Sequence, residues 1–147
     1  MPQSLSRVIV HMVFSTKGRA PWISEEFERA LYAFLASKLQ ADGNVPIKVG
    51  ACDDHVHCLF GLSRTVAIAK TVENIKSSSS TWMKTYQSDF AWQLGYAVFS
   101  VDPQETDGVV IYIEGQRAHH KGIDFKDEFR KLMLEHGISI DERYVWD

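Results

Sequence analysis

The sequence contains little cysteine, no long apolar run and no excess of positive charge. Its two cysteines, Cys52 and Cys58, match neither a zinc-ligand spacing nor a disulfide framework, so we expect reduced cytoplasmic thiols. No segment approaches the ~20 consecutive apolar residues of a membrane helix. The net charge of -3 argues against non-specific coating of duplex DNA, because such binding depends on many basic contacts. We therefore expect a soluble cytoplasmic protein that makes no contact with a membrane.

The chain has 147 residues, of which 45% are hydrophobic and 24% charged, and this is enough for one domain over residues 1–147 with one core. Basic residues nevertheless gather locally. Between residues 64 and 86 they are Arg64, Lys70, Lys76 and Lys84, and Glu73 is the one acid. Such a run is either a solvated helix face or a local nucleic-acid contact, and composition leaves both interpretations open.

The order of predicted elements favours one fold. Residues rich in β-branched and aromatic side chains predict strands over 7–16, 47–51, 55–62 and 96–101. Helical spacing predicts helices from an N-cap at Ser24 to residue 41, and over 65–86, 107–120 and 126–136. This order predicts an α+β, ferredoxin-like (split βαβ) antiparallel sheet with helices on one face, followed by C-terminal helices. Many functions use this fold, so the function has to be inferred from a site.

The first candidate site element is the triplet His55-Val56-His57 in a predicted strand. Side chains of a strand alternate between its faces, so both histidines are expected to point the same way. Two imidazoles placed like this are able to share one divalent metal ion. An isolated His-x-His pair is nevertheless more often one packed and one solvated residue.

The second element is Tyr112 with Gln116, four residues later in a predicted helix. This spacing puts both side chains on one helix face. Gln116 offers a neutral oxygen as a third metal ligand, and Tyr112 offers a phenol that can attack a phosphate. Two histidines and one amide leave coordination positions open, as a catalytic metal requires. We therefore predict a Mg²⁺ or Mn²⁺ site with Tyr112 beside it.

These residues and several flanking blocks resemble the HUH single-tyrosine transposases of the insertion sequence 200/605 (IS200-like) group. The resemblance extends over nearly the whole chain. It rests on the joint order of blocks at residues 14–19, 54–57, 75–82, 92–101, 112–116 and 137–146.

The resemblance implies a homodimer that recognises hairpins in single-stranded DNA, forms a 5′-phosphotyrosine and releases a 3′-hydroxyl. It implies Tyr112 as nucleophile and His55, His57 and Gln116 as metal ligands. It also implies that the tyrosine helix of one subunit completes the site of the other.

Weaker expectations concern contacts to DNA. The resemblance suggests Lys17 and Arg19, and the residues themselves suggest Lys76 and His120. The segment 102–108 contains proline, glycine and three acids, which we interpret as a flexible linker that lets the tyrosine helix swing away.

Three other functions compete with a mobile transposase. A replication initiator or relaxase is usually larger than this chain. A domesticated nuclease that binds hairpins would carry the same residues. A non-catalytic ferredoxin-like nucleic-acid-binding module would have no use for converging histidines.

Overall fold

The computed structural model describes residues 2–147, and its centre is a four-stranded antiparallel sheet. The strands lie in the order β2-β3-β1-β4. They span Ile9–Ser15 (β1), Val45–Cys52 (β2), His55–Gly61 (β3) and Ala97–Val101 (β4). All four predicted strands are present, and their order is the one a split βαβ unit requires. The predicted ferredoxin-like fold is therefore confirmed.

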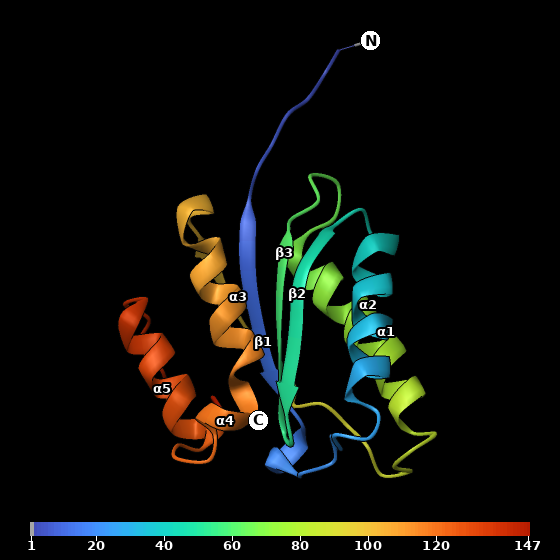
Figure 1. Ribbon diagram of the computed structural model, residues 1–147, viewed down its shortest axis with the longest axis vertical. Coiled ribbons are helices and arrows are strands. Elements are labelled where there is room, and N and C mark those ends of the chain that lie inside the picture. Colours follow the sequence, from blue (N-terminus) through green and yellow to red (C-terminus); the bar gives the residue numbers. More distant parts are fainter. Residues whose placement is uncertain (1) are drawn as a thin grey trace.

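Helices cover both faces of the sheet (Figure 1). Helices α1 (Glu28–Ala41) and α2 (Ile68–Met83) pack on one face. Helices α3 (Thr106–Glu114), α4 (Gln116–His119) and α5 (Phe125–Glu135) lie on the other. Two short 3₁₀ turns, η1 (Lys17–Arg19) and η2 (Pro103–Glu105), complete the chain. Among residues 2–147, no helix is long and apolar enough to cross a membrane.

The two faces of the sheet are chemically different. On β1, Val10, Met12 and Phe14 join the main apolar core beneath α1 and α2. The alternate residues point to the C-terminal helices, where Val13 contributes to a smaller apolar cluster and His11 is buried at 4% exposure. Because strand side chains alternate, one strand supplies both a dry core and a buried polar face. The second face carries the candidate site.

Helix α1 begins later than the sequence predicted. The side chain of Ser24 accepts a hydrogen bond from the Glu26 N–H at 3.2 Å, as in a local turn. The regular helix then begins at Glu28. Serine favours such local backbone contacts over helix, and this is why the predicted cap belongs to a turn that precedes the helix.

The predicted helix 107–120 is interrupted at Gly115. Glycine is a poor residue inside a helix, and here it ends α3 and precedes α4. Tyr112 and Gln116 therefore belong to two short helices, and the prediction of one unbroken helix is wrong. Both side chains nevertheless point the same way, because each donates a hydrogen bond to Glu128 Oε2.

The expected flexible linker before α3 is also ordered. The side chain of Asp102 accepts a hydrogen bond from the Gln104 N–H at 2.8 Å, and residues 103–105 form η2. An Asp followed by Pro favours such a capped turn, because the Asp side chain accepts a hydrogen bond from the N–H of the residue after the proline.

Candidate active site

Three histidines meet on the polar face of the sheet. His55 and His57 on β3 have ring centroids 5.1 Å apart, so the prediction that they share one face is confirmed. His11, from the neighbouring strand β1, places its Nε2 2.8 Å from His57 Nδ1. Both rings of the pair are fully buried. A hydrogen bond at Nδ1 leaves Nε2 of His57 as the atom that faces the C-terminal helices, and it orients the ring there.

A buried carboxylate, that of Glu128 on α5, completes this cluster. Its Oε1 lies 3.3 Å from Nε2 of His55 and 3.3 Å from Nε2 of His57. The side chain is only 2% exposed. Gln116 also reaches the cluster, with its Oε1 2.8 Å from His55 Nε2. Two imidazoles, one carboxylate and one amide oxygen therefore converge on one small volume.

The cluster fits a divalent cation. His57 Nε2 and Glu128 Oε1 are buried and have no hydrogen-bond partner, although they lie 3.3 Å apart. An unpaired carboxylate oxygen in the interior costs considerable free energy unless a proton or a metal ion compensates it. One ligand atom each from His55, His57 and Glu128 lies within 4.8 Å of the others. Imidazole and carboxylate donors together suit Mn²⁺ well, and the oxygens suit Mg²⁺.

Tyr112 lies directly beside these residues. Its hydroxyl donates a hydrogen bond to Glu128 Oε2, the oxygen opposite the one that faces the histidines. Its ring packs edge-on against His57, with centroids 5.6 Å apart. Burial, followed by the negative charge of Glu128, raises the pKa of Tyr112 well above its usual value. In this arrangement the phenol is therefore protonated, and Glu128 accepts its hydrogen.

The charges within the cluster compensate one another. Burial opposes ionisation of Glu128, but the adjacent rings of His120, His55 and His57 outweigh it and hold its pKa well below the usual range. For His55, burial disfavours the cation, but contacts with Asp54 and Glu128 raise its pKa to about 9. The metal-free cluster therefore holds a carboxylate balanced by a proton on His55. A bound cation would take the place of that proton.

The helices that carry Tyr112 and Gln116 are tightly attached to the sheet. A Cβ atom added at Gly50 of β2 would lie 2.5 Å from Ile113 Cγ2 and 2.8 Å from Ile113 O, so only glycine permits this approach. One residue after Gln116, the guanidinium of Arg117 donates to Glu28 at 2.7 Å and to Asp53 at 2.6 Å. These contacts hold α3 and α4 against the sheet of their own chain.

The residues expected to contact DNA occupy different environments. His120 belongs to the cluster, with its Nε2 3.0 Å from Gln116 Oε1. Arg19 lies 5.9 Å above the ring of Trp146 and has a left-handed φ of 56°. Lys17 is exposed in the same turn. Lys76 donates to the carbonyls of residues 93 and 95, which occupies much of its hydrogen-bonding capacity inside the protein.

Glu128 is a candidate site residue that the sequence did not predict. The buried residues of α5 are Phe125, Glu128, Phe129, Leu132 and Met133, which is a helical apolar stripe with one acid in it. An ionised side chain on such a stripe is rare unless it is paired or binds a metal. An acidic residue on an apolar helix stripe is therefore the sequence feature that could have indicated Glu128 as a site residue.

Comparison with known proteins places this geometry in a family. The family model described as "Transposase IS200 like" matches residues 4–116. A structure of a "putative transposase" from Deinococcus radiodurans R1 is 21% identical, with a TM-score of 0.63 over 80% of this chain and 96% of that one. A REP-associated tyrosine transposase bound to a REP hairpin is 11% identical, with a TM-score of 0.62 over 84% and 74%. No curated protein matches the sequence. The chain belongs to the IS200-like transposase family and is a DNA-cleaving transposase.

Proposed function

We propose that this transposase cuts and rejoins single-stranded DNA with Tyr112 as the nucleophile. The observation that carries the proposal is the position of the phenol, which touches a carboxylate that also faces His55 and His57. A metal ion, Mg²⁺ or Mn²⁺, would be held by His55 Nε2, His57 Nε2, Glu128 Oε1 and Gln116 Oε1. When bound, it would withdraw charge from a non-bridging oxygen of the scissile phosphate.

The proposed cleavage step is balanced by groups of this chain. The Tyr112 oxygen attacks phosphorus, the bond from phosphorus to the 3′ oxygen breaks, and a 5′-phosphotyrosine forms. As the bond to phosphorus forms, the phenolic proton leaves along the existing hydrogen bond to Glu128 Oε2, and the carboxylate relays it to the departing 3′ oxygen without retaining it. The reverse sequence rejoins the strand, because the phosphotyrosine retains the energy of the phosphodiester.

The proposed substrate is a hairpin in single-stranded DNA. One protein of similar fold, a REP-associated tyrosine transposase, binds a REP hairpin, and this supports the proposal. Lys17, Arg19, Lys76 and His120 stay our candidates for contacts to this DNA. Because phosphate contacts carry most of the affinity, binding should weaken as salt rises.

We also propose that the enzyme works as a homodimer in which each tyrosine helix completes the partner's site. In the single chain, Ile113 of α3 packs against Gly50 of its own sheet. The exchange would require α3 and α4 to leave this contact and to pack against Gly50 of a partner instead. The test is complementation between a Tyr112→Phe subunit and a His57→Ala subunit. Each is inactive alone, and a mixture regains activity only if the site is shared.

The decisive experiment for catalysis is a covalent-adduct assay. The protein is incubated with a single-stranded hairpin carrying its flanks and with Mn²⁺, and denaturing gels reveal DNA-linked protein. Tyr112→Phe should abolish the adduct, whereas Tyr144→Phe, a change at a tyrosine 64% exposed, should not. His57→Ala should abolish cleavage while hairpin binding persists. An adduct formed at the wild-type rate by Tyr112→Phe would refute the assignment.

A further inference from the structure

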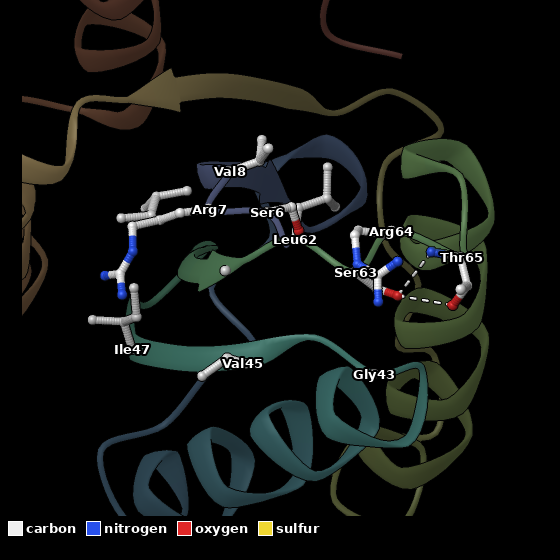
Figure 2. Close-up of a pocket in the computed structure, with 12 residues that line it drawn as sticks. Ser6, Arg7, Val8, Gly43, Val45, Ile47, Leu62, Ser63, Arg64 and Thr65 are labelled. Carbon is white, nitrogen blue, oxygen red and sulfur yellow. Dashed lines mark hydrogen bonds between the residues drawn. The ribbon is translucent and has the colours of Figure 1, made fainter. Parts of the chain in front are cut away.

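A groove at the far end of the sheet contains no residue of the tyrosine and histidine cluster. Figure 2 shows the residues that line it. It has a volume of about 540 Å³ and lies between the segment before β1, the start of β2 and the loop after β3. The sheet register gives its position. His57 pairs with Val13 of β1, whereas Gly61 at the groove pairs with Ile9. Four residues of strand correspond to a separation of about 13 Å along β1.

The floor of the groove is apolar and exposed. Val45 is 66% exposed, Val8 47% and Ile47 39%. Apolar side chains gathered on a surface often mark a binding site. The neighbouring wall is preformed, because the Ser63 N–H donates to Asn44 Oδ1 at 2.8 Å and the Ser63 hydroxyl lies 3.0 Å from that of Thr65. The groove therefore offers a fixed, partly apolar surface.

Two arginines flank this surface. Figure 2 shows Arg7 beside Ile47 on one side and Arg64 beside Thr65 on the other, with Val45 between them. Among residues 2–147, none of those that line the groove is acidic. Within residues 2–147, neither arginine forms an ion pair, and the same holds for Arg19 and Arg29, whereas Arg117, Arg130 and Arg143 are paired. In a chain with a net charge of -3, two unpaired guanidinium groups around an apolar floor favour a ligand that carries both a negative charge and an apolar surface.

We propose that this groove binds a nucleotide of the single-stranded DNA flanking the scissile site. Its base would lie on Val45 and its neighbours, and its phosphates would contact Arg7 and Arg64. A second copy of the chain fits less well, because Pro46 on the β2 edge cannot donate to an added strand. The inference rests on the proposed function, since the strand that occupies the groove is an extension of the substrate held at Tyr112.

The test compares two hairpins that both carry the single-stranded flank with the cleavage site; the flank of one ends just beyond that site, and the flank of the other has an extension long enough to reach the groove. Fluorescence anisotropy gives the affinity of each for the wild-type protein and for the double variant Arg7→Gln, Arg64→Gln. We expect the extension to tighten binding to the wild type and to lose most of that gain in the variant. The slope of log affinity against log salt should fall by roughly 1.4, which is ~0.7 for each of two lost phosphate contacts to a single strand.

Two further variants keep the test specific. Arg29→Gln with Lys131→Gln removes the same charge from exposed positions on α1 and α5, and it should retain the gain from the extension. Val45→Asp places an acid on an exposed part of the floor and should abolish that gain without unfolding the protein.

The inference is overturned if the extension adds no affinity or if the arginine variant behaves like the control. It is also overturned if a double-stranded extension binds equally well, or if Val45→Asp alters only self-association. Failure of the proposed function is distinguishable, because it removes the Tyr112 adduct with the short-flanked hairpin as well. An adduct that forms normally without any effect of the extension contradicts this inference alone.

Discussion

The close packing of Ile113 against Gly50 allows a test of how the tyrosine helix is positioned. In Gly50→Ala, the new methyl group would lie 2.5 Å from Ile113 Cγ2, whereas unstrained carbon contacts are ~3.5 to 4.0 Å. Helix α3 would therefore move by about 1 Å. Overpacking of this kind destabilises by about 1–3 kcal/mol. A displacement of ~1 Å at a reacting group can cost about 100-fold in rate. We expect the rate of adduct formation to fall by roughly that factor.

The assay measures single-turnover adduct formation together with urea unfolding. Gly108→Ala is the matched control, because it lies on the same helix and a Cβ there meets nothing within 4 Å. It should leave the rate unchanged and stabilise the protein slightly, by about 0.5–1 kcal/mol. In a site shared between two subunits, Ile113 of one chain would pack against Gly50 of the other, so the prediction holds whichever chain supplies Tyr112. Equal rates for the two alanine variants would refute the reasoning.

Three further predictions concern the charged groups. Glu128→Gln keeps the side-chain shape but removes its charge, so Mn²⁺ affinity measured by calorimetry should fall at least tenfold, while DNA binding is retained. Arg117→Gln removes contacts to Glu28 and Asp53 and should slow adduct formation; combined with Asp53→Asn, its effect should be clearly less than additive. In the metal-free protein, the raised pKa of His55 means that its stabilisation is complete below pH 6.5 and is lost as pH rises through about 9, so the free energy of unfolding should fall by up to about 3 kcal/mol over that interval.

Each of these predictions has its own check. Glu135→Gln, an exposed acid on the same helix, should leave Mn²⁺ affinity intact. Additive effects of the Arg117 and Asp53 changes would contradict the coupling. For the pH experiment, burial and the nearby charge of His57 lower the pKa of His11 to about 3, so its contribution changes only below pH 6.5 and does not disturb the window. Unfolding free energies that stay constant from pH 6.5 to 9 would contradict the role assigned to His55.

The sheet and its histidine pair were predictable because both depend on a period of two residues. That period puts Val10, Met12 and Phe14 in one core and His55 and His57 on the opposite face. Turn and helix boundaries were less predictable, since they depend on local competition. Asp102 orders a turn that composition suggested was flexible, and Gly115 interrupts a helix that spacing suggested was continuous.

The carboxylate of Glu128 was not predictable from spacing. It lies 71 positions after His57, on an element whose place in the fold is fixed only by tertiary packing. A metal site assembled from distant segments has no short motif. The two histidines, in contrast, form one because a single strand holds both.

Glu128 lies outside the part of the chain that matches the family model. The match ends at residue 116, whereas the carboxylate that touches Tyr112 is at 128. A chain cut at residue 116 would keep the sheet, Tyr112, His55 and His57. It would lose Glu128, the carboxylate that contacts these three side chains. Members of the family that share every motif could therefore differ in metal preference and nucleophile reactivity through the helix beyond the boundary. Sorting such relatives requires a comparison of folded structures at this helix.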